Sequence, residues 1–301
     1  MRMRQVATAA AIALVATIYP APASAAAPGT AAALDTAMHD EATAYADYSA
    51  WASHADSAGH HHLASLLATI AGQERDEHYA ELASAANLVA DTVTNLQTST
   101  LGEIGEAENI YPAMAAQAVA DGDSVTAALF RELADDEDSH QRLLDAASRA
   151  LRYGGIWTVP IAPDTDPVRI VEGPALATGR TLDNVRQAMR GEAYASAKYR
   201  LFAQAAYASG QAKVGRLFAG LSTIELAEHY AALANRYGLV RSDQANLWAA
   251  VQAENGAIMA YARWSSDATT VGDTASYRLL AGIMGDEVDH RELFIGASGT
   301  L

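Results

Sequence analysis

The most informative stretch of the chain runs from Leu129 to Leu144 and reads LFRELADDEDSHQRLL. One face of a helix here would carry Phe130, Leu133, Glu137, His140 and Leu144, which follow one another at steps of three or four residues. A charged glutamate costs free energy in an apolar interior unless something compensates it. A Glu-x-x-His pair, one turn apart, is also the arrangement by which bundled helices bind metal ions. The stretch therefore predicts either a metal site inside a helical bundle or, since charged residues are mostly exposed, a solvated helix face.

The composition favours an all-α protein. Half of the 301 residues are hydrophobic and only 7% are aromatic, which suits closely packed helices, and the length is enough for two domains. The formal charge of -16 argues against nucleic acid and anionic membranes as partners. The chain has no cysteine, so disulfides and thiolate sites are excluded and any metal must be held by carboxylate and imidazole.

The N-terminal stretch has the pattern of a secretory signal peptide. Arg2 and Arg4 precede an apolar run over residues 6–18, and Ala23-Ser24-Ala25 fits cleavage after Ala25. The apolar run is short for a membrane span, and the arginines are not adjacent, which favours the general secretory route over the twin-arginine route. We expect residues 1–25 to be removed and the mature protein to be exported, without a membrane partner after cleavage.

Four helices are expected in the first half, over residues 34–57 and 63–85, from about residue 95, and from residue 124 after a turn at Gly122. Asn87 is the expected left-handed cap of the second helix. Among the acids and histidines of these helices, the candidates for metal binding are Glu41, Glu74, Glu77, His78, Glu103, Glu106, Glu137 and His140. On the first, second and fourth helices these acids interrupt an otherwise apolar stripe.

Residues 153–179 have a different composition, rich in glycine, proline and β-branched residues, without helical periodicity. This predicts a linker, with a short strand at Arg169-Ile170-Val171 as an option. We therefore expect a first domain over residues 30–152 and a second over residues 180–297.

The second half repeats the first at an offset of 192 - 41 = 151 residues. Glu41 returns as Glu192, Tyr48 as Tyr199, Glu74 as Glu225, Glu77 as Glu228, His78 as His229 and Glu103 as Glu254; with one residue deleted, Glu137 and His140 return as Glu287 and His290. Two halves that agree on acids inside apolar stripes favour the metal interpretation over a solvated face.

Three motifs follow one another in the first half: Gly102-Glu103-Ile104-Gly105-Glu106, Ile110-Tyr111-Pro112 and Glu137-Asp138-Ser139-His140. In this run the chain resembles the rubrerythrins of the ferritin-like superfamily, and the resemblance extends over both halves outside the linker. It implies two tandem four-helix bundles, each with two bridged metal ions, of which iron is favoured and manganese or zinc are alternatives. The metal ligands that it implies are Glu41, Glu74, Glu77, Glu103, Glu106, Glu137, His140, Glu192, Glu225, Glu228, Glu254, Glu287 and His290. Tyr48 and Tyr199 would lie beside the metals.

The chain departs from the family on its second helix. Glu77 and Glu228 occupy the register where the family has histidine, and His78 and His229 come one residue later. Positions i+3 and i+4 flank the direction of residue i on a helix, so either could reach the metal. We expect the glutamates to be ligands and the histidines to lie just behind them.

Two further departures concern the chemistry. Glu106 has Ala257 as its counterpart, so the second site looks more generally ferritin-like. The rubredoxin-like module of many relatives requires cysteines, so sustained turnover would need an external electron donor.

The connection between the second and third helices is short for this superfamily. The resemblance implies a crossover along the bundle, whereas the free residues, 87–94, span roughly 27 Å at full extension. An up-down-up-down order of helices is the alternative.

Three functions fit these observations. The first is a di-iron oxidoreductase that reacts with peroxide or oxygen, peroxidase-like or ferroxidase-like, with Glu74 and Glu137 bridging one metal pair and Glu225 and Glu287 the other. The second is a non-catalytic protein that sequesters metal outside the cytoplasm, and the third is a purely structural bundle. The oligomeric state stays open. A separate tripeptide, His60-His61-His62, is expected to be a solvated histidine cluster at a helix start.

Overall fold

The computed structural model describes residues 26 and 28–299, and within them every regular element is a helix. The predicted all-α class is confirmed, and in these residues no strand forms at Arg169–Val171. The predicted signal peptide lies outside the described residues. None of the described helices combines the length and the apolar character needed to cross a bilayer.

The helices of the first half begin and end close to the predicted positions. They are α1 (Pro28–Ser57), α2 (His61–Gln73), η1 (Glu74–His78), α3 (Tyr79–Ala85), α4 (Thr92–Gly105), η2 (Glu106–Ile110), α5 (Tyr111–Ala120) and α6 (Ser124–Arg152). Asp91 and Asp123 cap α4 and α6, since each side chain accepts hydrogen bonds from backbone amides of the first turn. Asn87 has a φ of 53°, so the predicted left-handed cap is confirmed.

A short 3₁₀ helix, η3 (Ile156–Thr158), lies in the linker, and the second half then repeats the order of helical rods. The repeated helices are α7 (Gly179–Ala208), α8 (Ala212–Ile224), η4 (Glu225–Tyr230), α9 (Ala231–Tyr237), α10 (Asp243–Thr270) and α11 (Thr274–Ser298). The segments η1, η2 and η4 are π-helical insertions within longer α-helical rods. α10 runs through without such an insertion, although it corresponds to α4, η2 and α5.

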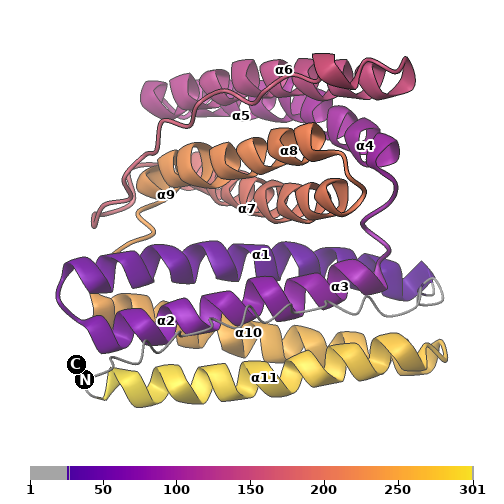
Figure 1. The fold of residues 1–301 in the computed structure, drawn as a ribbon. Coiled ribbons are helices and arrows are strands. Elements are labelled where there is room, and N and C mark those ends of the chain that lie inside the picture. The colour runs from indigo at the N-terminus through magenta and orange to yellow at the C-terminus, as the bar shows by residue number, and fades with distance from the viewer. Residues whose placement is uncertain (1–25, 27, 300–301) are drawn as a thin grey trace, which may run out of the picture.

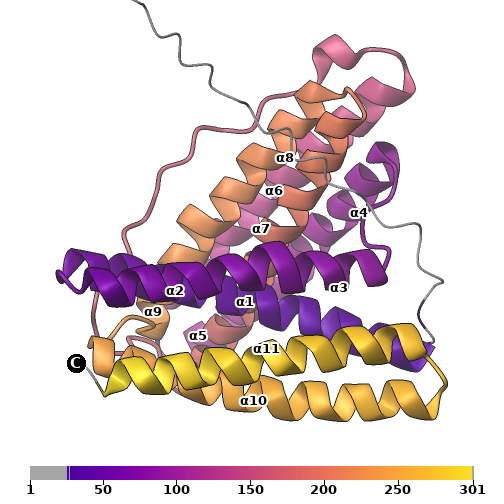
Figure 2. The ribbon, with the colours of Figure 1, turned by 60° about the horizontal axis from the view of Figure 1, so that its bottom comes forward.

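Each four-helix bundle takes two helical rods from each half of the chain (Figure 1). Bundle I consists of α1, the rod α2–η1–α3, α10 and α11, and bundle II consists of the rod α4–η2–α5, α6, α7 and the rod α8–η4–α9. In Figure 2 the rods of bundle II run steeply across those of bundle I. Hydrogen bonds join the halves inside each bundle: the Tyr48 hydroxyl on α1 donates to Glu254 on α10, and the Tyr199 hydroxyl on α7 donates to Glu103 on α4.

This exchange corrects the predicted division into domains at residues 30–152 and 180–297. It also removes the predicted crossover. The connection from α3 to α4 does not run along one bundle but leads from bundle I to bundle II (Figure 1). The eight residues 87–94 are enough to reach the neighbouring bundle, whereas they are barely long enough to run the length of a bundle. The short connection therefore favours the exchanged arrangement.

Backbone hydrogen bonds hold the linker against η4 of bundle II and against the connection that follows α9. Val168 N donates to Ala227 O over 2.8 Å, and Gly173 N donates to Val240 O over 3.0 Å. Gly238, at the end of α9, has a φ of 70°, and a Cβ there would lie 2.4 Å from the backbone N of Ala175. Glycine is thus required both by the turn and by the close approach of the linker.

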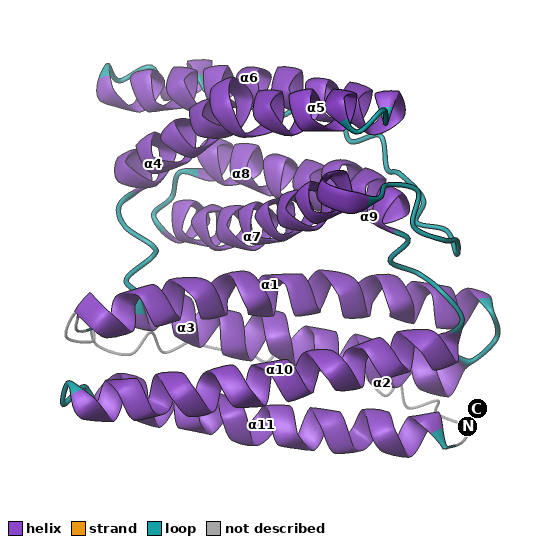
Figure 3. Cartoon of the chain, turned by 180° about the vertical axis from the view of Figure 1, so that it is seen from behind, coloured by secondary structure: helices purple, strands orange, loops and turns teal. Residues whose placement is uncertain are grey.

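The two bundles meet along α1 and α7 (Figure 3). The His39 ring stacks on the Tyr194 ring with centroids 3.8 Å apart, and Arg190 Nη2 lies 3.0 Å from Asp40 Oδ1. The Tyr230 hydroxyl on η4 donates to the half-buried Asp47 carboxylate on α1, which also joins the two bundles. Because α1 belongs to bundle I and α7 to bundle II, their contact joins the two bundles.

The exchange of helices predicts that a cut in the linker leaves the protein in one piece. A protease site inserted after Asp164, where the linker is exposed, yields two fragments that each contribute half of both bundles. On size exclusion the cut protein is expected to co-elute with the intact chain and to separate only after unfolding. Two species of half the size under native conditions would instead indicate independent tandem bundles.

Candidate metal centres

Each bundle buries six carboxylate and imidazole side chains at its centre. Site I in bundle I consists of Glu41, Glu74, His78, Glu254, Glu287 and His290, and site II in bundle II consists of Glu103, Glu137, His140, Glu192, Glu225 and His229. All twelve residues are at most 3% exposed. Since fully buried glutamates are rare unless they are paired or bound to metal, each cluster needs a compensating charge.

The donor atoms of site I form two overlapping groups. One group is Glu41, Glu74, His78 and Glu287, the other is Glu74, Glu254, Glu287 and His290, and within each group the donor atoms lie within 4.8 Å of one another. His78 Nδ1 lies 2.8 Å from Glu74 Oε2 and 3.5 Å from Glu287 Oε1. His290 Nδ1 lies 3.1 Å from Glu74 Oε1. Glu74 and Glu287 belong to both groups, so they are the carboxylates placed to bridge two ions.

Site II has the same construction. Its groups are Glu103, Glu137, His140 and Glu225, and Glu137, Glu192, Glu225 and His229. His140 Nδ1 lies 2.8 Å from Glu137 Oε2, and His229 Nδ1 lies 2.8 Å from Glu225 Oε2. The shared carboxylates are Glu137 and Glu225. The predicted bridging pairs, Glu74 with Glu137 and Glu225 with Glu287, are therefore corrected, because the exchange of helices recombines them.

The π-helical segments explain which residue of the second helix faces the site. The amide of Tyr79 donates to Glu74 O, a bond between residues i and i+5. A turn closed in this way holds one residue more than an α-helical turn, so residue i+4 returns to the side of residue i. His78 therefore lies beside Glu74, and in η4 His229 lies beside Glu225 in the same way.

This geometry corrects the expectation for Glu77 and Glu228. Glu77 is exposed to solvent, and Glu228 Oε1 instead accepts a hydrogen bond of 2.6 Å from the linker amide of Asp166. The histidines that were expected behind the metals contribute donor atoms to the clusters. The prediction assumed α-helical spacing throughout, because no residue pattern in the sequence indicates the π turn.

Four buried tyrosines hold the glutamates that come from helices without a Glu-His pair. The Tyr48 hydroxyl donates to Glu254 Oε1 over 2.6 Å, and Tyr199 donates to Glu103. Both were expected beside the metals. Tyr111 donates to Glu192 and Tyr261 to Glu41, and the prediction missed these two roles, although their spacing of 150 residues repeats that of Glu137 and Glu287.

Two aspartates lie behind the histidines and were also missed. His78 Nε2 is 3.4 Å from Asp286 Oδ2, and His229 Nε2 is 3.4 Å from Asp136 Oδ2. A carboxylate in this position favours the proton on Nε2 and leaves the Nδ1 lone pair for a metal. The signal in the sequence was an aspartate directly before the glutamate of each Glu-x-x-His pair.

The electrostatics of both clusters show strong crowding of negative charge. Burial, together with the charges of Glu287 and Glu74, raises the pKa of Glu41 well above its usual range. Burial and the Glu287 charge raise the pKa of Glu254 to about 11. Burial lowers the pKa of His140, but the nearby Glu225 and Glu137 outweigh it and raise that pKa to about 10. Without cations the clusters retain protons, which bound metal would release.

The donor set fits two divalent cations in each site. Several carboxylate oxygens of the clusters are buried and accept no well-aligned hydrogen bond, although histidine nitrogens lie close to some of them: Glu74 Oε1, Glu103 Oε2, Glu137 Oε1 and both Glu225 oxygens. Orphaned buried carboxylate oxygens are costly unless they coordinate a cation. A glutamate from each of two helices and a Glu-His pair from each of the other two is the di-metal donor set of helical bundles.

Glu106 marks a difference between the sites. It lies beside site II, where burial and the charges of Glu192 and Glu137 raise its pKa, but its oxygens are outside the converging groups. The Gly191 backbone approaches it, since a Cβ there would lie 3.8 Å from Glu106 Oε1. Ala257 takes the corresponding place in bundle I, so the Glu106 carboxylate has no counterpart at site I.

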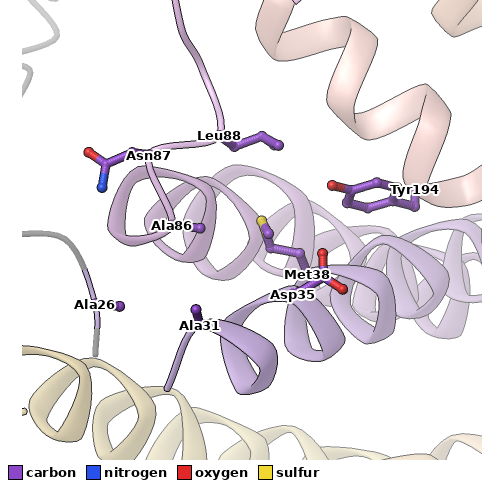
Figure 4. A pocket seen from close by; sticks show the side chains of 8 residues that line it. All are labelled: Ala26, Ala31, Asp35, Met38, Ala86, Asn87, Leu88 and Tyr194. Carbon is purple, nitrogen blue, oxygen red and sulfur yellow. The ribbon is translucent and has the colours of Figure 1, made fainter. Parts of the chain in front are cut away.

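A cavity at the junction of the bundles is not part of either site. It has a volume of about 320 Å³ and is lined by residues of α1, the α3–α4 connection and α7, among them Met38, Leu88 and Tyr194 (Figure 4). Its one carboxylate, Asp35, belongs to neither cluster. The cavity therefore offers no metal-binding donor set of its own.

The family comparison agrees with this geometry. Residues 32–148 match the family model named Rubrerythrin. The match supports the rubrerythrin and ferritin-like family for this segment. No curated protein and no solved structure matches the chain. The matched segment supplies Glu41, Glu74 and His78 to site I and Glu103, Glu137 and His140 to site II, so neither site is complete within it.

The π turn predicts opposite results for two adjacent residues. His78→Ala removes a donor atom from site I and is expected to lower its affinity for Fe(II) by more than about tenfold, as losses around metal ligands do. Glu77→Ala removes an exposed side chain and should leave the affinity unchanged. Metal titration of the metal-free variants measures both; a loss confined to Glu77→Ala would contradict the assignment.

Charge crowding predicts that metal stabilises the fold. At about 100 times the dissociation constant a bound ion adds about 2.7 kcal/mol of stability, so a chelator should lower the melting temperature. Glu137→Ala removes a carboxylate shared by both groups of site II and should shrink this effect. The control is Glu132→Ala, an exposed acid on the same helix. A wild-type melting curve indifferent to chelator would show that the sites are not occupied.

Proposed function

We propose that the protein is a di-metal carboxylate protein of the rubrerythrin type, with two di-iron centres, that reacts with peroxide or oxygen. The observation that carries this proposal is the pair of buried six-residue clusters, each with two carboxylates placed between two groups of donors. The match of residues 32–148 to the Rubrerythrin model supports it. Carboxylates with imidazoles also accommodate manganese and zinc.

The residues around each cluster have separate tasks. Glu74 and Glu287 would bridge the ions of site I, and Glu137 and Glu225 those of site II. When bound, a pair of ferrous ions supplies two electrons to the O–O bond of the oxidant. The tyrosine hydroxyls fix the rotamers of the four glutamates they contact, and Asp136 and Asp286 orient His229 and His78. Both clusters are at most 3% exposed, which limits the access of water.

A function in metal sequestration is the second candidate. The chain contains no cysteine, so it has no thiolate-bound iron centre that could return electrons to the di-metal sites. If the protein is exported, as the N-terminal stretch suggests, ferrous iron and reductants are scarce around it. A binding role would need the same ligands without turnover.

Rapid mixing of the Fe(II)-loaded protein separates these functions. We expect peroxide to oxidise the bound iron faster than oxygen does, and both to act faster than on iron in buffer. The control is a double variant, Glu74→Ala with Glu137→Ala, which loses a shared carboxylate in each site. Oxidation no faster in wild type than in this variant would contradict the oxidoreductase and leave sequestration; faster reaction with oxygen would indicate a ferroxidase.

A further inference from the structure

The outer face of α10 is an exposed surface that neither metal site accounts for. Inside bundle I, α10 packs against α1 and α11, and its other side lies at the edge of the molecule (Figure 2). Trp248 and Met259 are on this outer side and are 65% and 74% exposed. A single exposed apolar side chain needs no explanation, whereas several on one face indicate an interaction surface.

Six residues of this face follow one another at alternating steps of three and four. We call them the α10 stripe: Ala245, Trp248, Gln252, Asn255, Met259 and Ala262. Such steps keep residues on one narrow side of a helix, which is the spacing by which two long helices pack side by side. None of the six is buried, so the α10 stripe is open to a partner helix.

The α10 stripe is symmetric about its own middle. Trp248 and Met259 lie equally far from the point midway between Ala253 and Glu254. The two alanines of the stripe and its two amide residues are placed in the same way. Two copies of α10 that pack antiparallel about a two-fold axis at that point therefore set Trp248 of each copy against Met259 of the other.

The middle of the α10 stripe provides a polar pairing. In the antiparallel arrangement Gln252 of one copy lies opposite Asn255 of the other. Asn255 Oδ1 accepts a hydrogen bond of 3.4 Å from Arg291 Nη1, which leaves the amide nitrogen of Asn255 to donate to the glutamine oxygen. A polar pair at such a position fixes the register of paired helices.

The charges on the outer face of α10 also fit a second copy. Arg241, just before α10, and Asp267, near its end, are exposed and opposite in sign. Antiparallel pairing brings Arg241 of each copy to the end of the other helix that carries Asp267, so opposite charges meet at both ends. Between these two residues the only acid apart from the buried Asp243 is Glu254, which is 2% exposed. On a chain with a formal charge of -16, this face therefore lets a second copy approach without meeting a row of acids.

The corresponding rod of bundle II lacks such a stripe. Gln97 stands where α10 has Trp248, and the π turn η2 shifts the residues that follow it to another face of the rod. α10 has no such insertion, so its residues keep one face over the whole helix. The stripe is thus a property of α10 and not of the bundle architecture.

We propose that α10 is the surface through which two copies of the chain form a dimer, paired antiparallel along the α10 stripe about a two-fold axis. Glu254 and Tyr261 lie on the buried face of the same helix, so pairing also stabilises the helix that supplies them to site I. A single pair of helices is a small interface beside the roughly 800 Å² per partner of stable complexes. We therefore expect a dimer that dissociates on dilution.

Sedimentation equilibrium of the full chain over a range of concentrations tests the proposal. Wild type should pass from monomer to dimer as the concentration rises. Trp248→Glu and Met259→Glu should each weaken the dimer by at least about tenfold, because they place a charge inside the paired surface. The control is Leu101→Glu on α4, which replaces an apolar side chain that is 71% exposed in bundle II and should leave association unchanged.

Disulfide trapping tests the direction of pairing, and it is specific because the chain has no cysteine of its own. Ala245→Cys and Ala262→Cys are purified separately and oxidised either alone or mixed. Position 245 of one copy faces position 262 of the other, whereas two copies of the same position lie about 25 Å apart, too far for a disulfide. Only the mixture should form a covalent dimer.

Three results would overturn the proposal. One is a wild-type chain that stays monomeric at every concentration, and another is a loss of association in Leu101→Glu as large as in the two α10 variants. The third is a covalent dimer that one cysteine variant alone forms as readily as the mixture does.

Discussion

Mutual repulsion of buried carboxylates is the constraint on which the rest of the structure depends. Each bundle places four glutamates at its centre, and burial together with their neighbours' charges pushes several of their pKa values upward. The two histidines in each cluster, when protonated, offset only half of this charge. Two divalent cations balance all four carboxylates once the histidines are neutral ligands, and they give partners to the orphaned oxygens. The tyrosines, aspartates and π turns are then means of holding the ligands in place.

The exchange of helical rods gives this constraint a second consequence. Neither half of the chain contains a complete cluster, because Glu41 and Glu74 meet Glu254 and Glu287, whereas Glu103 and Glu137 meet Glu192 and Glu225. Binding of metal in either site therefore holds the two halves together. The linker bonds to the carbonyl of Ala227 within η4, so it also contacts the rod that carries Glu225 and His229.

The sequence predicted the elements and most of the buried acids, because a glutamate in an apolar helical stripe stands out at a period of 3.6 residues. It did not predict which rods pack together, since the two halves are similar enough for Glu74 to fit with either Glu137 or Glu287. The short connection near Asn87 was the one clue to the exchange. The π turn was missed because it depends on backbone bonds, such as that from Tyr79 to Glu74, which no side-chain pattern requires. Tyr261 and Asp286 were missed because a tyrosine or an aspartate at such a position more often serves packing or solvation.

The central claim is that each cluster, assembled from both halves, holds two metal ions. Anomalous scattering from a crystal of the metal-loaded protein tests it most directly. Two pairs of peaks are predicted, one between Glu74 and Glu287 and one between Glu137 and Glu225, with about 3.5–4 Å between the ions of each pair. Single peaks, or no peaks at these four glutamates, would contradict it.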